Sequence, residues 1–330
     1  MIIQMIGCLI IWNTLTAVSL VALFLDTGLC AKLIALTPLT LTISFHVFKN
    51  SNVKESNKKT FFANFKLGGH RGSPLEAPEN SVESFKKAKE AGCEVVEFDI
   101  HLSSDGIPVL IHDDTTQRTS RENVTIAETT FDEIKHIPLN EVKGISAGIP
   151  TLEETVDWCQ QNKMRMIFDV KCAEKRMIEA LTHLIKTKNL YDSVIISSFD
   201  AMVPYLIKRI DSKILTGFTS RVDNYVYYDD DRTMTYTSTT EYYLYSILDD
   251  LIELGIRLFV LPVFLGVDML LLHYKNINGY LVDDSLSFGI HVVAWTVNDQ
   301  ETANFLRSMK VPILSDQPQN LNDNKQTTQV

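Results

Sequence analysis

The sequence has few cysteines, no internal repeat and no excess of basic residues. Its five cysteines are odd in number and contain no C-x-x-C pair, so they indicate no disulfide framework. No segment recurs with a period of about 20 to 50 residues, which excludes a repeat architecture. Acidic residues outnumber basic ones by 41 to 31, and the net charge of −10 argues against nucleic acid as a partner.

Two apolar stretches at the N-terminus, residues 5–25 and 29–48, account for a mean hydropathy that is high for a soluble enzyme, +0.02. Each is long enough to cross a bilayer, which takes about 20 apolar residues. We therefore expect residues 1–49 to form a membrane hairpin or anchor with one or two transmembrane segments. A signal peptide is the alternative, but it would begin with basic residues and have a shorter apolar core.

Polar segments flank the rest of the chain. Residues 50–64 are polar and contain lysines, so we expect a linker between the anchor and a catalytic domain at 65–318. The last residues, 319–330, are polar and predicted to be disordered.

Two carboxylates, Glu97 and Asp99, lie within an apolar run that is typical of a buried strand. Side chains alternate between the faces of a strand, so both carboxylates point the same way, roughly 6.5–7 Å apart. Buried like charges are costly unless a cation lies between them, and oxygen ligands with no cysteine nearby favour Mg²⁺ or Ca²⁺. For such a pair on its own, a solvated strand face is the alternative.

A second strand-like run places Asp169 and Lys171 on one face. Asp169 adds a third carboxylate, and Lys171 beside it can hold a phosphate oxygen as a point charge. Arg71 can grip two phosphate oxygens through its planar guanidinium. A structural Asp–Lys pair is the alternative.

Two histidines, His70 and His112, each follow closely on an apolar run. Imidazole exchanges protons near neutral pH. A lone histidine is more often a core or surface residue, but two that bracket a carboxylate pair favour an acid–base couple. The motifs together predict phosphodiester chemistry.

The order of these motifs resembles the glycerophosphodiester phosphodiesterase family, and the matching segments run from about residue 65 to about residue 318. Two of them, Ala77–Asn80 and Phe168–Lys171, are most similar to the membrane-anchored animal members. Many members have Glu at the position of Asp169. The matching segments are Gly69-His70-Arg71-Gly72, Ala77-Pro78-Glu79-Asn80-Ser81, Glu97-Phe98-Asp99, residues 104–113, Phe168-Asp169-Val170-Lys171, Ser197-Ser198-Phe199, Trp295-Thr296-Val297-Asn298 and Ser315-Asp316.

The resemblance implies a TIM barrel whose strand ends hold one divalent cation, with glycerol 3-phosphate and a free alcohol as products. It also implies a role for each motif residue: His70 and His112 in catalysis, Arg71 and Lys171 on the phosphate, Glu97, Asp99 and Asp169 on the metal, and Trp295 in the substrate pocket.

The pattern of apolar runs predicts the same α/β TIM barrel independently, because eight strand candidates alternate with helical segments. Asn80 with Glu83 and Thr151 with Glu154 have the spacing of a capping box, and Gly92 is expected to end a helix. The strand candidates are 65–70, 94–100, 165–171, 193–199, 213–218, 267–273, 290–297 and 311–315.

The segment 241–265 is more apolar than a barrel loop should be. Its four central charged residues would each cost roughly 2.5–3.5 kcal/mol at the centre of a bilayer, which argues against a transmembrane helix. We expect a partly helical insertion between the fifth and sixth strands that rests on a membrane surface near the active site. An ordinary packed helix is the alternative.

The predicted function is the metal-dependent hydrolysis of glycerophosphodiesters. Candidate substrates are glycerophosphoinositol, other deacylated phospholipids, lysophospholipids and N-acyl glycerophosphoethanolamines. Two alternatives are a phospholipase D-like lipid enzyme of the same fold and a catalytically inactive, membrane-tethered interaction protein.

The apolar N-terminus predicts an integral membrane protein of the endomembranes or plasma membrane. Lysines after Phe48 favour a cytosolic barrel by the positive-inside tendency. The resemblance and the glycosylation sequon Asn123-Val124-Thr125 favour a lumenal or extracellular barrel, which is the orientation we predict.

Overall fold

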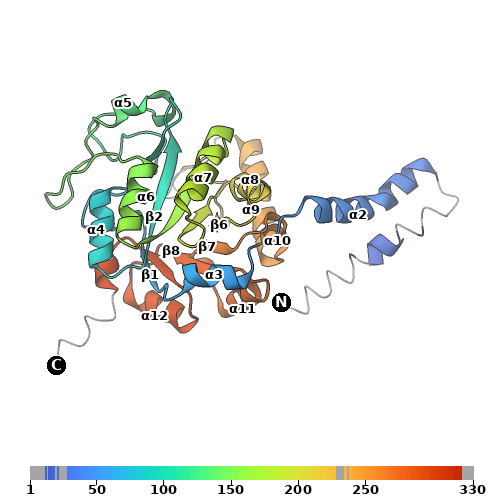
Figure 1. Cartoon of the computed structure of the whole chain (residues 1–330). Helices are drawn as coiled ribbons and strands as arrows, with labels where there is room; N and C mark the ends of the chain where they lie inside the picture. The colour runs from blue at the N-terminus through green and yellow to red at the C-terminus, as the bar shows by residue number, and fades with distance from the viewer. Residues whose placement is uncertain are drawn as a thin grey trace.

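Eight parallel strands close into a barrel in the computed structural model, which describes residues 12, 14–18, 21, 28–227, 234–235 and 238–321. Each strand pairs with the next barrel strand, and β1 pairs with both β2 and β9, which closes the sheet. The predicted TIM barrel is confirmed (Figure 1). Its strands are β1 (Leu67–Gly69), β2 (Val95–Leu102), β4 (Arg165–Val170), β5 (Val194–Ser197), β6 (Leu215–Ser220), β7 (Met269–His273), β8 (His291–Trp295) and β9 (Ile313–Ser315).

The alternation along β2 decides which side chains enter the barrel. Val95 belongs to the core inside the barrel, and Glu97 and Asp99 follow it at intervals of two. Phe98 faces the other way and packs against Phe85 of the covering helix, with ring centroids 5.4 Å apart. Both carboxylates therefore point into the barrel, as the sequence predicts.

Helices cover the outside of the barrel (Figure 1). The predicted capping box at Thr151 and Glu154 is confirmed, and Gly92 follows α4 with a φ of +86°. The cap predicted at Asn80 is wrong by one residue, because Ser81 accepts the hydrogen bond from the first turn. The helices that follow barrel strands are α4 (Val82–Glu90), α6 (Leu152–Gln161), α7 (Lys175–Lys188), α8 (Met202–Ile210), α9 (Thr239–Arg257), α10 (Val260–Leu265), α11 (Gly279–Ser287) and α12 (Gln300–Ser308).

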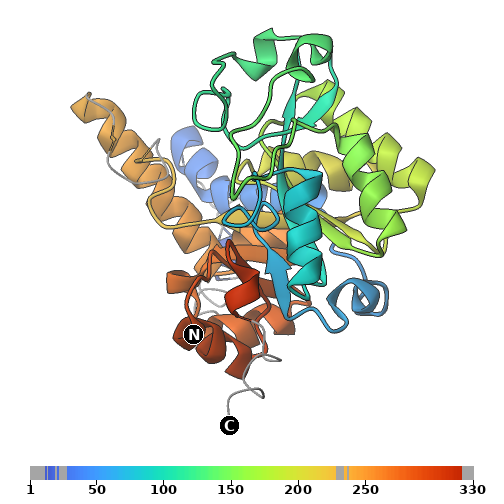
Figure 2. The same cartoon turned by 90° about the vertical axis from the view of Figure 1, so that its left-hand side faces the viewer.

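A ninth strand, β3 (Pro108–Leu110), is not among the predicted strands and runs antiparallel to β2. It belongs to an excursion over residues 103–150, which also contains η1 (Ile126–Glu128) and α5 (Phe131–Ile134). The excursion has a small apolar core of its own and lies at one end of the barrel (Figure 2). It carries His112 to the barrel mouth.

The connection between β6 and β7, the fifth and sixth barrel strands, contains α9 and α10. Figure 2 shows α9 extending outward beside α2 (Leu29–Phe48). The end of α2 contacts α10, where Asn50 N–H donates to the carbonyl of Phe264 at 2.9 Å and the rings of Phe45 and Phe264 lie 5.5 Å apart.

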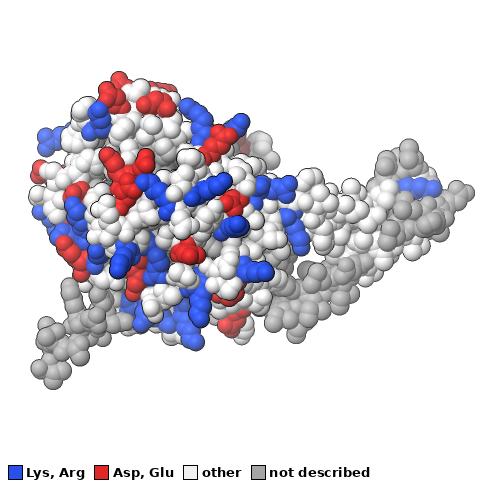
Figure 3. Space-filling model, in the orientation of Figure 1, with Lys and Arg blue, Asp and Glu red and all other residues white. Residues whose placement is uncertain are grey.

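The expected membrane hairpin is not supported. Among the described residues, no helix combines the length and the apolar character needed to cross a bilayer. The prediction of an integral membrane protein, and with it the predicted lumenal or extracellular orientation, is therefore wrong. Few charged side chains appear on α2 in Figure 3, and the helix contains Lys32, Pro38 and His46. Most of the segment 5–25 lies outside the described residues.

The segment expected to be a linker, 50–64, packs against the barrel instead. It forms α3 (Glu55–Phe62), and Phe61 joins the core inside the barrel. Lys58 is buried beside Asp268 at 3.4 Å, and Val53 N–H donates to the same carboxylate at 2.6 Å. Near the C-terminus, η3 (Pro318–Asn320) ends the fold, and residues 322–330 of the predicted tail lie outside the described residues.

Candidate active site

Three buried carboxylates meet inside the barrel. Glu97 and Asp99 come from β2, and Asp169 of β4 lies directly opposite Asp99 in the strand register. One oxygen from each carboxylate lies within 4.8 Å of the other two. Burial and the charge of Asp99 raise the pKa of Glu97 to about 8.

Lys171 and Arg71 supply positive charge beside these carboxylates. Lys171 Nζ lies 2.6 Å from Asp99 Oδ1 and 2.6 Å from Asp169 Oδ2, and Arg71 Nε lies 3.4 Å from Asp99 Oδ2. Although burial acts in the opposite direction, Lys171, His112 and Arg71 hold the pKa of Asp99 well below its usual range.

The carboxylate group fits a hard divalent cation. Its donors are all carboxylate oxygens, which Mg²⁺ and Ca²⁺ prefer, and no cysteine belongs to the group. Glu97 accepts a hydrogen bond from the backbone N–H of Arg71 at 2.9 Å, while Lys171 bridges the other two carboxylates. Burial and the neighbouring Asp99 disfavour the charged form of Glu97, and a bound cation would favour it.

His70 follows β1 and is oriented by a carboxylate from the far end of the chain. Its Nδ1 lies 2.7 Å from Asp316 Oδ1, and these residues are 246 positions apart. Asn298 fixes Asp316, since Asn298 Nδ2 donates to Asp316 Oδ2 at 2.8 Å and Asn298 Oδ1 accepts from Asp316 N–H at 2.9 Å. Burial would lower the pKa of His70, but the hydrogen bond to Asp316 and the charge of Glu97 outweigh it and raise that pKa.

His112 has a matching arrangement on the excursion. Its Nδ1 lies 2.6 Å from Asp113 Oδ1, and Arg118 Nε donates to Asp113 Oδ2 at 2.8 Å. Arg118 also donates to both oxygens of Glu79, at 2.8 and 2.7 Å, and Glu79 accepts from Arg71 Nη1 at 3.3 Å. A continuous chain of ion pairs therefore connects His112 to Arg71.

The turn after β1 places Arg71 in an unusual backbone conformation. Arg71 has a φ of +53°, and Gly72 follows at +87°. A Cβ on Gly72 would lie 2.3 Å from Ser84 Oγ, so only glycine fits there. Left-handed backbone at a non-glycine residue costs roughly 1–3 kcal/mol and persists where the surroundings impose it. Here it aims the Arg71 N–H at Glu97 and its side chain at Asp99.

Asn80 is a site residue that its sequence context did not reveal. Its side-chain amide donates to Asp99 Oδ2 at 2.9 Å and its carbonyl oxygen accepts from Asp99 N–H at 3.1 Å. Asp316, Asn298, Asp113, Arg118 and Glu79 were also not assigned roles in advance, although most lie in the segments that carry the resemblance.

The predicted residues all line one cavity of about 380 Å³. Trp295 forms part of its wall, stacked on His70 at 6.3 Å and edge-on to Phe199 at 5.6 Å. Its indole N–H donates to the carbonyl of Leu271 at 3.2 Å, which fixes the ring. The cavity is also lined by His70, Arg71, Glu97, Asp99, His112, Asp169 and Lys171.

Comparison with known proteins agrees with this arrangement. A family model described as "Glycerophosphoryl diester phosphodiesterase family" matches residues 70–320. The chain belongs to this family. The resemblance seen in the sequence is thereby confirmed, and the chain is a glycerophosphodiester phosphodiesterase.

Proteins from several organisms are similar to the chain in sequence or in fold. The mouse protein glycerophosphodiester phosphodiesterase 1 is 29% identical over 247 residues, which cover 72% of this chain and 73% of that protein. A phosphodiesterase from Oleispira antarctica, solved in complex with the product sn-glycerol-3-phosphate, superposes with a TM-score of 0.61 at 26% identity, covering 78% of this chain and 94% of that one. A glycerophosphodiester phosphodiesterase from Agrobacterium tumefaciens shares the fold, with a TM-score of 0.59 at 16% identity over 77% of this chain and 97% of that one.

Proposed function

We propose that the chain hydrolyses glycerophosphodiesters to glycerol 3-phosphate and an alcohol with the help of one divalent cation, Mg²⁺ in preference to Ca²⁺. One observation carries the proposal: the buried Glu97, Asp99 and Asp169 lie in the same cavity as two histidines, each bound to its own carboxylate. The product-bound relative from Oleispira antarctica supports glycerol 3-phosphate as the common product.

One histidine acts as the general base and the other as the general acid. Asp316 accepts from Nδ1 of His70, which leaves Nε2 to act as base on water or on the glycerol 2-hydroxyl. His112, held by Asp113, protonates the leaving alkoxide. Both histidines line the cavity, so a phosphodiester between them has a base and an acid within reach.

Arg71 and Lys171 hold the phosphate, and Trp295 packs against the substrate in the pocket. A divalent cation bound by the three carboxylates would neutralise charge on the phosphoryl oxygens. Lys171 donates to Asp99 and Asp169 in the structure. Its role on the phosphate therefore requires those carboxylates to be compensated by a bound cation.

The substrates we propose are glycerophosphoinositol and other deacylated phospholipids, with lysophospholipids and N-acyl glycerophosphoethanolamines as lipid-like candidates. The apolar face of α9 favours the lipid-like group, since Leu244, Ile247, Leu251 and Leu254 are each more than half exposed. Contact of this face with a lipid surface would bring such substrates to the barrel mouth.

Two other functions remain distinguishable by experiment. A phospholipase D-like lipid enzyme of the same fold would cleave intact lipids but not glycerophosphodiesters. A catalytically inactive interaction protein would release no product. The presence of the paired histidines and the buried carboxylates in one cavity argues against it, because an inactive protein needs neither.

Release of glycerol 3-phosphate from each candidate with an unacylated glycerol, and of acylglycerol 3-phosphate from lysophospholipids, tests the proposal with and without a chelator. We expect release that stops on chelation and returns most fully with Mg²⁺. Release that is unchanged in excess chelator would contradict the metal site, and release of no glycerol 3-phosphate from any substrate would contradict the function.

A further inference from the structure

A second cavity of about 330 Å³ adjoins the catalytic one, between α9 and the ends of β6 and β7. The two cavities share Phe199, Thr219, Arg221, Lys275 and Asn276 as lining residues. A substrate bound at the carboxylates can therefore extend into the second cavity without leaving the barrel mouth.

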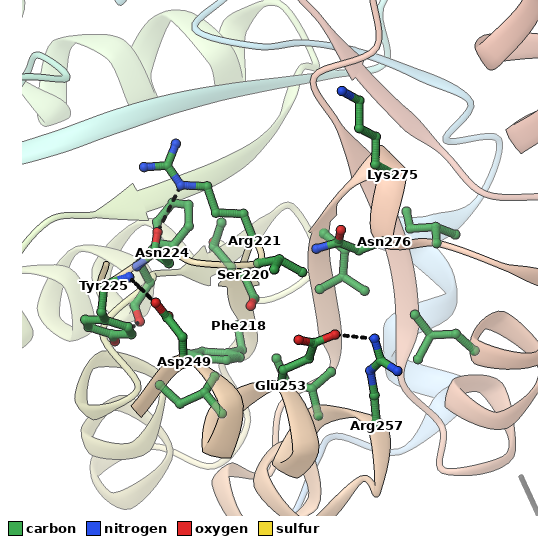
Figure 4. A pocket seen from close by; sticks show the side chains of 18 of the residues that line it. Phe218, Ser220, Arg221, Asn224, Tyr225, Asp249, Glu253, Arg257, Lys275 and Asn276 are labelled. Carbon is green, nitrogen blue, oxygen red and sulfur yellow. Dashed lines mark hydrogen bonds and ion pairs between the residues drawn. The ribbon is translucent and has the colours of Figure 1, made fainter. Parts of the chain in front are cut away.

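The inner wall of this cavity is apolar and its carboxylates are already engaged. Buried side chains from β6, α9 and β7 form the wall, among them Phe218 and Ile256. Asp249 accepts the backbone N–H groups of Tyr225 and Val226, at 3.0 and 2.9 Å. The second acidic group, Glu253, pairs with Arg257 one turn along α9 (Figure 4).

Two cations line the wall that the cavities share. Figure 4 shows Arg221 and Lys275 across from each other, on the side of the cavity away from the Glu253–Arg257 pair. Arg221 Nε donates to Asn224 Oδ1 at 3.2 Å. Lys275 lies 5.8 Å from the ring of Tyr274, and no described carboxylate lies within ion-pair distance of its ammonium.

We propose that the second cavity receives the leaving alcohol, and that Lys275 favours leaving groups that carry a second anion, a carboxylate or a phosphate. The inference rests on the proposed function. Arg71 and Lys171 already lie beside the buried carboxylates. The single charge of a phosphodiester gives no reason for a further cation at Lys275, which has no described carboxylate within ion-pair distance, whereas an anion on the leaving group does.

Two matched pairs of substrates test the charge preference. Glycerophosphoinositol 4-phosphate is compared with glycerophosphoinositol, and the glycerophosphodiester of glycolate with that of ethylene glycol. Lys275→Met should raise KM for the anionic member of each pair about threefold to tenfold, with kcat unchanged. KM and kcat for the neutral member of each pair should keep their wild-type values. Lys275→Arg should restore the preference for the anionic members.

If KM rises only for glycerophosphoinositol 4-phosphate, the preferred anion is a phosphate. If it rises only for the glycolate diester, the preferred anion is a carboxylate. Equal changes for anionic and neutral substrates, or no change for any, would overturn the assignment of Lys275. If the wild-type chain hydrolyses none of the four, the proposed function fails, and this inference fails with it.

Substitutions that fill the second cavity test whether the leaving alcohol lies there, independently of the charge preference. Ile256→Phe narrows the cavity, and Leu254→Phe adds the same bulk to the exposed face of α9 as a control. We expect Ile256→Phe to lower kcat/KM for glycerophosphoinositol about tenfold while the ethylene glycol diester and the control variant keep wild-type values. An equal loss for both leaving groups, with an unchanged melting temperature, would show that the leaving alcohol lies elsewhere. If Ile256→Phe does not fold, Lys275→Met alone decides.

Discussion

The hydrogen bond between His70 and Asp316 makes one substitution unusually informative. In Asp316→Asn, an amide replaces a carboxylate whose Oδ2 accepts from Asn298 Nδ2 at 2.8 Å and whose Oδ1 faces His70 Nδ1 at 2.7 Å. The Asn298 amide group is a donor, so the new amide must turn its oxygen toward Asn298. Its NH₂ group then faces Nδ1 of His70, which moves the ring proton to Nε2.

The expected loss follows from that tautomer. A histidine with its proton on Nε2 cannot act as a base there, and general base catalysis contributes about 10²- to 10⁴-fold. We expect kcat for glycerophosphoinositol to fall by about that factor, with little change in KM because Arg71 and Lys171 are untouched. Removing the carboxylate also removes a cause of the raised pKa of His70. A base must be deprotonated, so the acidic limb of the residual activity should move to lower pH.

A compensating change separates this explanation from a general loss of structure. Asn298→Asp in the Asp316→Asn background supplies an acceptor for the new NH₂ group, which lets the amide oxygen face His70 again. We expect at least a tenfold recovery of kcat, measured by release of glycerol 3-phosphate. A double variant no more active than Asp316→Asn alone would refute the tautomer argument. Asp113→Asn, beside His112, is the matched control, and adding Asn298→Asp to it should recover no kcat.

Three further predictions concern the metal, the acid–base couple and α9. Glu97→Ala removes one of three buried carboxylates, so activity should fall by orders of magnitude. The melting temperature without metal should stay near that of the wild type or rise, because a buried charge is removed. Full activity in this variant would exclude the metal site. If His70 and His112 act as one couple, the double alanine variant should be little slower than either single variant, and multiplied losses in kcat would indicate separate roles. Replacing the exposed Leu244 and Leu251 with serine should lower activity on lysophospholipids several-fold more than on glycerophosphoinositol; equal losses would reject contact of α9 with lipid.

The barrel could be predicted from the sequence because most of its strands are buried on both faces. Such strands appear as short continuous apolar runs, and each of the eight predicted runs overlaps a barrel strand. The carboxylate positions followed from the same regularity. Once Val95 is known to be buried, the two-residue period carries Glu97 and Asp99 to the same face.

Asn80 shows where local rules fail. Its spacing to Glu83 suggested a helix cap, but a capping residue needs an extended backbone, and Asn80 has a φ of +54°. Ser81, at −118°, takes the cap. The left-handed conformation frees the Asn80 side chain for both the backbone and the carboxylate of Asp99. Only the folded turn decides which of two adjacent capping residues caps the helix.

Composition alone misled at the N-terminus. The polar segment 50–64 was expected to be a linker because lysines favour solvent, yet Lys58 is 1% exposed. Its ammonium is compensated by Asp268, which also pairs with the buried Lys208 at 2.6 Å. A buried charge is tolerated when an opposite charge and hydrogen bonds accompany it. That partner lies more than 200 positions away, so no window of sequence could have indicated it.

The two histidines proposed to be catalytic could be selected from the sequence in part. His70 and His112 stood out because they bracket a carboxylate pair. Their orienting carboxylates differ in how far they lie along the chain. Asp113 is adjacent to His112, whereas Asp316 reaches His70 only because β9 closes the barrel against β1. The proposed catalytic residues are thus visible as motifs, but the carboxylate that orients His70 is brought to it by closure of the barrel.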